Sequence, residues 1–359
     1  MNLRIAAAAL LLAYCVAALA GEKRGAEDKE EGKTSPKVQK EEGKKRDEKE
    51  EDPEKEWPPN FADLLGLQPK SIEECWLPPT AGPFATFTAP ITEKDHIVLQ
   101  PFFFYNWTRG TFDDNSHYHS LPKGDRKETA VESLFMQYAP VDNFEVDAQL
   151  FINEVRTRQA GKSASASGLA DTLLMARYNL LHQTNAWWCP ETSLLTQIKL
   201  PTGKHDHADP NLLGIDLMGT GSTDLTIGLD LTKCYKPLIL HGDLWYSWPI
   251  ETQIDGVPTR YGDYLQWNAG VEIPFWKDKF AYMLEFNGLH QANTRERGVA
   301  VGGNRVNNVS MGTGIEYIPR DDLQFLIGYQ RTLWGTNVDA NDTFGITLVW
   351  CFGLPNKKK

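Results

Sequence analysis

The sequence predicts an all-β protein, a transmembrane antiparallel up-and-down β-barrel of about twelve strands that follows a disordered, charged N-terminal extension. Two observations support this prediction. From residue 96 onward, apolar side chains recur at every second position, the spacing at which a strand sends successive side chains to opposite faces. The connections between these segments are long and short in turn, as in barrels whose two termini lie on one side of a membrane.

The first twenty residues predict export. Arg4 precedes an apolar run over 5–20 that ends on Ala18 and Ala20, the small residues that signal peptidase recognises. This run is short of the roughly 20 apolar residues that a helical span needs. We therefore expect residues 1–20 to be a signal peptide.

Four further regions follow the signal peptide. Residues 21–56 are nearly all charged and predict a disordered periplasmic spacer, although a periplasmic partner of this arm stays open. Residues 57–93 are expected to form a periplasmic or plug-like segment, either below the barrel or within it. Residues 94–352 form the predicted barrel and 353–359 a C-terminal tail. The formal net charge of −11 excludes a nucleic-acid partner, since phosphates would be repelled.

The alternating segments have one apolar face and one polar or small face. In 225–231, four Leu or Ile residues alternate with Thr226, Gly228 and Asp230, and 265–273, 280–287 and 344–352 repeat the pattern. A buried, unpaired carboxylate would cost several kcal/mol in a soluble sandwich core, whereas the lumen of a barrel hydrates it. The apolar face is therefore expected to meet lipid, which accounts for a mean hydropathy as low as −0.43.

The lengths of the connections fit this topology. Long outer loops are expected at 109–128, 157–167, 204–221, 251–259, 292–305 and 335–340, with short inner turns at 140–143, 233–237, 276–279 and 319–322. Aromatic residues gather near the expected strand ends, where interfacial girdles belong.

Charged residues on the inner face are the candidate pore-lining set. Acids outnumber bases among them, so the lumen is either a polar, cation-tolerant path or a network of paired charges that holds the barrel rigid. No cofactor and no metal site are expected. The candidates are Glu145, Asp147, Asp171, Arg177, Lys199, Asp230, Asp243, Glu272, Glu285 and Glu316.

Four cysteines of the expected mature chain fall on the periplasmic side, an oxidising compartment. Cys189 precedes one strand and Cys234 follows the next, so these two are candidates for a disulfide. Cys75 and Cys351 flank the first and last strands and form a second candidate pair. Unpaired or intermolecularly linked thiols remain the alternative.

Three functional classes can be compared. No Gly-x-Ser-x-Gly elbow and no His-x-Ser pair on a strand is present, so we do not expect an enzyme such as an outer-membrane hydrolase. Passage of small solutes fits the polar inner face. A structural or adhesive role would be favoured if Phe102, Phe104, Phe151, Trp245 and residues 57–90 blocked the lumen.

Three motifs resemble those of the outer-membrane protein family of the MetA pathway of phenol degradation: residues 168–178 (GLADTLLMARY), 199–203 (KLPTG) and 219–224 (GTGSTD). The resemblance covers roughly residues 97–352. It implies a barrel that transports small solutes, including aromatic or apolar ones. Outer-membrane lipid, a small-molecule solute and the barrel assembly machinery are then the expected partners. Phe352 is the expected assembly signal, although seven residues follow it.

Overall fold

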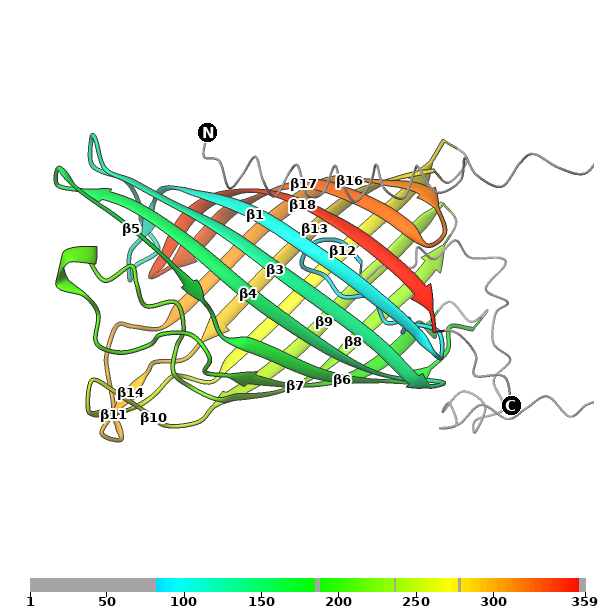
Figure 1. The fold of residues 1–359 in the computed structure, drawn as a ribbon, viewed down its shortest axis with the longest axis horizontal. Helices are drawn as coiled ribbons and strands as arrows, with labels where there is room; N and C mark the ends of the chain where they lie inside the picture. Colours follow the sequence, from blue (N-terminus) through cyan, green and yellow to red (C-terminus); the bar gives the residue numbers. More distant parts are fainter. Residues whose placement is uncertain (1–81, 185–187, 236, 277–278, 355–359) are drawn as a thin grey trace, which may run out of the picture. The chain divides into compact units, whose positions relative to one another are not determined.

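The computed structural model describes residues 82–184, 188–235, 237–276 and 279–354. One antiparallel sheet of 14 strands makes up most of the described residues (Figure 1), and its first and last long strands pair along their length, from His96 opposite Gly353 to Phe112 opposite Val338. Two short strands, β2 (Tyr118–Ser120) and β5 (Lys162–Leu169), each pair with a single strand and lie outside the closed path. The other twelve make the barrel: β1 His96–Phe112, β3 Arg126–Val141, β4 Phe144–Gln159, β6 Thr172–Leu181, β7 Glu191–Leu200, β8 Asp224–Tyr235, β9 Leu238–Pro249, β12 Tyr264–Phe275, β13 Phe280–Gln291, β16 Val306–Arg320, β17 Leu323–Thr336 and β18 Val338–Gly353.

The predicted alternation is confirmed along β8. Leu225 and Leu229 are 45% and 44% exposed on the outer face, whereas Asp230, next to Leu229, is fully buried on the inner face. Strand β18 repeats this arrangement, with Phe344 exposed outside and Gly345 buried inside. The outer wall is therefore a continuous apolar surface of the kind that lipid requires.

The two ends of the barrel differ. At the end where β1 begins and β18 finishes, which we call the turn end, short connections join the strands. At the opposite, loop end, two hairpins replace loops that we expected. Residues 157–167 continue β4 and β5 around a turn at Ala160 and Gly161, and residues 335–340 are strand apart from Asn337. Both expectations were wrong because these strand ends carry Ser, Ala, Asn and charged residues, which leave no apolar alternation to recognise.

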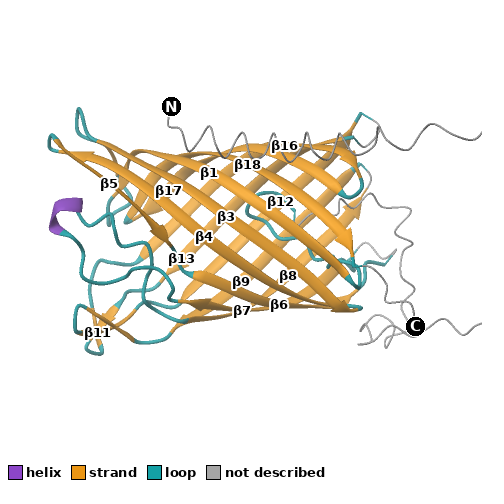
Figure 2. Ribbon diagram, in the orientation of Figure 1, coloured by secondary structure: helices purple, strands orange, loops and turns teal. Residues whose placement is uncertain are grey.

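The remaining long loops cover the loop end. Residues 252–300 contribute four short strands to a separate sheet: β10 Thr252–Ile254, β11 Val257–Arg260, β14 Arg295–Glu296 and β15 Val299–Ala300. The loop over 201–223 holds the short helix η3 (Pro210–Leu212), the purple turn in Figure 2. No helix among the described residues is long and apolar enough to span a membrane.

Several expectations concern residues outside the described ranges. The signal peptide at 1–20, the spacer at 21–56 and residues 57–81 of the plug-like segment lie there. Cys75 does too, so its pairing with Cys351 stays a prediction. Residues 82–92 are described, and they lie inside the barrel (Figure 1). We call them the luminal segment.

A charge on the outer wall should destabilise the barrel. Leu229 lies at the middle of β8, so Leu229→Arg should lower the free energy of unfolding in lipid vesicles by about 2–4 kcal/mol. Urea titration of the vesicle-embedded protein measures this change. Leu229→Met, which keeps the position apolar, is the control. Equal stability of both variants would mean that this face does not meet lipid.

Candidate functional site

The luminal segment is held to the wall by its own backbone. Glu285 on β13 accepts hydrogen bonds from the amides of Ala85 (3.0 Å) and Thr86 (3.2 Å), and Asp243 on β9 accepts one from Phe87 (3.0 Å). Further along, the Ala89 amide donates to the Thr232 hydroxyl on β8 (2.9 Å), and the Thr92 amide donates to Glu145 on β4 (2.7 Å). A buried chain without secondary structure needs such acceptors, because unpaired amides are costly away from water.

Arg177 on β6 lies at the centre of this arrangement and is fully buried. Its guanidinium forms ion pairs with Glu145 (2.5 Å) and Asp230 (3.2 Å), and it donates a further hydrogen bond to the carbonyl of Thr88. One cation therefore joins two carboxylates of the wall to the backbone of the luminal segment. Asp230 is oriented in turn by the indole of Trp245, which donates to it at 2.8 Å.

Phe87 fixes the middle of the luminal segment by packing. Its ring centroid lies 4.8 Å from that of Trp245 and 5.8 Å from that of Phe135, and the guanidinium carbon of Arg177 lies 5.6 Å from it. Together these contacts combine aromatic packing with a cation–π interaction.

Phe84 fixes the start of the segment against two glycines. A Cβ at Gly328 would lie 2.2 Å from the Phe84 ring, and one at Gly345 would lie 3.2 Å from it. The ring also meets Phe104 edge-on, with centroids 5.8 Å apart. Sequence reasoning missed Phe84 and Phe87. Glycines on the inner face of β17 and β18 were the available signal, because glycine within a strand often marks a close approach.

Asp171 and Lys199 stabilise a different part of the wall, where the three motifs at 168–178, 199–203 and 219–224 meet. Asp171 accepts hydrogen bonds from the amides of Gly203 (3.1 Å) and Thr220 (2.8 Å). Lys199 lies 2.7 Å from Asp224 and 3.9 Å from Asp171. A Cβ on Gly219 would lie 2.4 Å from the Asp171 carboxylate. The motif residues thus bring the two ends of the 201–223 loop together.

The three remaining candidates are buried but form no hydrogen bond with the luminal segment or with the 201–223 loop in the described part of the chain. Asp147, Glu272 and Glu316 are each at most 4% exposed, and their carboxylates accept no hydrogen bond within the described part of the chain. His241 Nε2 lies 3.4 Å from Glu272. The ten candidates therefore divide into residues that hold the luminal segment, residues that hold a loop, and these three. Across the described ranges, no group of three His, Cys, Asp or Glu side chains could hold a metal ion.

The expected disulfide between Cys189 and Cys234 is not formed, although both side chains are buried. Continued by two residues, the β7–β8 ladder would place them opposite each other, but β7 begins only at Glu191. Pro190 cannot donate the next ladder hydrogen bond. The chain leaves the sheet there, and the Cys189 carbonyl accepts a hydrogen bond from the Lys233 ammonium instead (2.9 Å).

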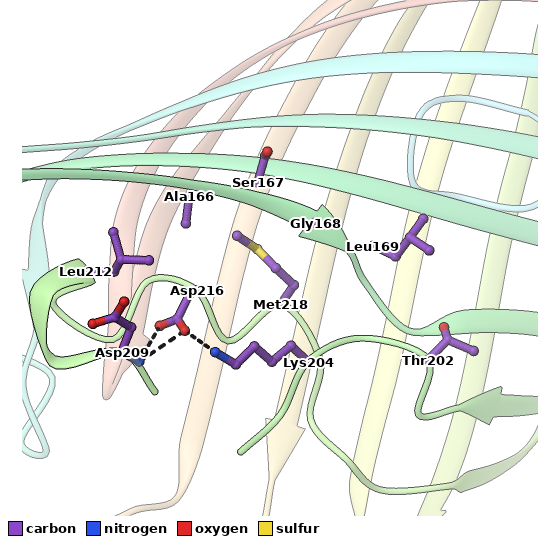
Figure 3. A pocket seen from close by; sticks show the side chains of 10 residues that line it. All are labelled: Ala166, Ser167, Gly168, Leu169, Thr202, Lys204, Asp209, Leu212, Asp216 and Met218. Carbon is purple, nitrogen blue, oxygen red and sulfur yellow. Dashed lines mark hydrogen bonds and ion pairs between the residues drawn. The ribbon is translucent and has the colours of Figure 1, made fainter. Parts of the chain in front are cut away.

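A pocket of about 460 Å³ lies at the loop end, between β5 and the 201–223 loop (Figure 3). The loop side is ordered by Asp216, which accepts hydrogen bonds from Lys204 and from the Asp209 amide (3.1 Å). The Lys204 hydrogen bond is the main cause that lowers the pKa of Asp216 below its ordinary value. The residues that line the pocket are Ala166, Ser167, Gly168, Leu169, Thr202, Lys204, Asp209, Leu212, Asp216 and Met218.

A closed barrel with an apolar outer wall and a charged interior defines a membrane-spanning outer-membrane β-barrel protein. The model of the family described as "Putative MetA-pathway of phenol degradation" matches residues 104–350, and the chain belongs to this family. No curated protein matches it.

Solved structures share the fold. An outer membrane channel from Pseudomonas putida F1 superposes with a TM-score of 0.61 at 12% identity, over 76% of this chain and 99% of that one. The translocator domain of the autotransporter NalP from Neisseria meningitidis gives 0.40 at 13% identity, over 73% and 90% of the two chains. The NanC porin gives 0.41 at 11% identity, over 70% and 98%. The first similarity shows a common fold, whereas the other two are too low to support a conclusion.

Removing the central cation should destabilise the barrel strongly. Arg177→Met leaves Glu145 and Asp230 buried without their partner, which should cost about 3–5 kcal/mol of unfolding free energy. Urea unfolding in vesicles measures the loss. The triple variant R177M/E145Q/D230N removes the stranded charges and should recover most of the stability. If it is no more stable than Arg177→Met, the charges are not the cause.

Proposed function

We propose that the protein is an outer-membrane channel for small solutes whose lumen is closed at rest by the luminal segment. The observation that carries this proposal is how the segment is attached. It is an irregular chain held by hydrogen bonds to separate side chains and by the packing of Phe84 and Phe87, and not a strand of the wall or a folded domain. Hydrogen bonds of this kind can be exchanged for water one at a time, so the segment can move while the barrel stays intact.

The proposed orientation follows from the two ends. Barrels of this class have short periplasmic turns and longer extracellular loops. The turn end then faces the periplasm and the N-terminal extension lies there, while β10, β11, β14, β15 and the 201–223 loop face outward. Outer-membrane lipid surrounds the wall, and the barrel assembly machinery would insert it.

A filled lumen is also what a structural or adhesive barrel would have. Phe102 packs with the cluster around Phe87 and Trp245, as that alternative anticipated. The channel is favoured because the family is one of phenol degradation and because the barrel from Pseudomonas putida F1 that shares this fold is a channel. Both support apolar or aromatic small solutes, and neither supports an enzyme.

Single-channel recording of the full chain in planar bilayers tests the proposal. The wild type should be mostly closed, with brief openings. E285Q/D243N replaces two carboxyl acceptors of the luminal segment by amides, which offer one acceptor oxygen in place of two, and each hydrogen bond lost in this way costs about 0.5–1.5 kcal/mol. The open probability should therefore rise about tenfold or more, since 1.4 kcal/mol corresponds to a factor of ten.

Glu272→Gln is the matched control, because Glu272 is equally buried but accepts no hydrogen bond from the described luminal segment. Its conductance should equal that of the wild type. Folded wild-type and E285Q/D243N proteins that both stay silent would argue for a structural or adhesive barrel. An open wild type that E285Q/D243N does not alter would mean that the segment is not the gate.

A further inference from the structure

The pocket at the loop end lies near the point where strand β4 changes its pairing partner. The lower part of β4, from Phe144 to Gln149, pairs with β6, and its upper part, from Ile152 to Gln159, pairs with β5. Strand β5 has no second partner among the described strands. The 201–223 loop therefore faces an unpaired sheet edge, and the pocket opens between the two (Figure 3).

We propose that this pocket binds the solute before it reaches the lumen, and that the solute is a small uncharged molecule with an apolar body and one hydroxyl or carbonyl group. This inference deepens the proposed channel function and rests on it. A volume of about 460 Å³ lies within the range of small-molecule sites. None of the residues of the luminal segment lines the pocket.

The apolar part of the lining comes from both sides. Leu169 on β5 is 59% exposed, and Leu212 and Met218 approach from the loop. Gly168 leaves room for Met218, whose Cγ would lie 3.3 Å from a Cβ at that position. A flexible thioether beside a glycine adapts to ligands of different shape, and burial of apolar surface supplies the driving force.

The polar part of the lining selects for one hydrogen-bonding group. The second edge of β5 presents backbone N–H and C=O groups without a strand partner in the described chain, and Ser167 adds a hydroxyl. The charged side chains of the pocket are already engaged, because Lys204 pairs with Asp216 and the Asp209 carboxylate accepts a hydrogen bond from the Asn211 amide (2.8 Å). A charged ligand would have to compete with these contacts, whereas a neutral hydroxyl can bond to the strand edge without disturbing them.

Protection of an introduced thiol tests the site in the full-length protein. Leu212→Cys places a thiol in the pocket, and the neighbouring Leu213→Cys places one that is also half-buried but does not line it. The modification rate of each by a maleimide is read by peptide mass spectrometry, with benzyl alcohol as the probe. At about five times its Kd, benzyl alcohol should slow Leu212→Cys about sixfold, because only free sites react.

Leu213→Cys should react at an unchanged rate, and adding Met218→Asp to Leu212→Cys should abolish the protection. Absence of protection at Leu212→Cys, or equal protection at Leu213→Cys, would overturn the site. Toluene, which lacks the hydroxyl, should protect at least tenfold less well; equal protection by toluene would overturn the assigned solute class. Bilayer conductance is read separately, so a silent channel contradicts the channel function without altering the protection result.

Discussion

The structure depends on one constraint: the peptide groups of the luminal segment, an irregular chain inside a barrel, need hydrogen-bonding partners. The wall strands cannot supply these partners, because their backbone groups are already used within the ladders. Side chains must do so instead. Glu285, Asp243 and Glu145 accept from the luminal segment, and Arg177 donates to it. The acidic side chains of the interior are thus explained by the backbone amides that they bind, and Arg177 offsets part of the buried negative charge.

A similar solution recurs at the other end of the wall, where a carboxylate again binds backbone amides. Asp171 holds the two ends of the 201–223 loop, and the close approach of Gly203 and Gly219 leaves no space for a side chain. The family motifs are therefore structural. They fix the loop that forms one side of the pocket, and Gly168, Leu169 and Thr202 of the motifs line the pocket that we propose as the solute site.

The sequence predicts the wall well because lipid imposes a simple rule on it. Alternation along β8 and β18 gives the strands, their faces and the strand number. It fails at the hairpins of β4–β5 and β17–β18, where the strands extend with small and polar residues and lipid no longer selects apolar ones. It also misses why Glu145 and Glu285 are acidic, because their partners lie 53 and about 200 positions away. Only the folded chain joins such distant residues.

The position of the luminal segment also constrains how the protein can be assembled. Residues 82–92 come before β1 in the chain, yet their hydrogen-bonding partners lie on β4, β8, β9 and β13. The Phe84 ring fits against β17 and β18, the latter being the strand that seals the wall against β1. A segment that is synthesised before the wall can thus reach its final position only when the last strand of the wall is in place. Insertion into the membrane and filling of the lumen are therefore coupled late steps, and a barrel arrested before β18 docks would be both open-sided and empty.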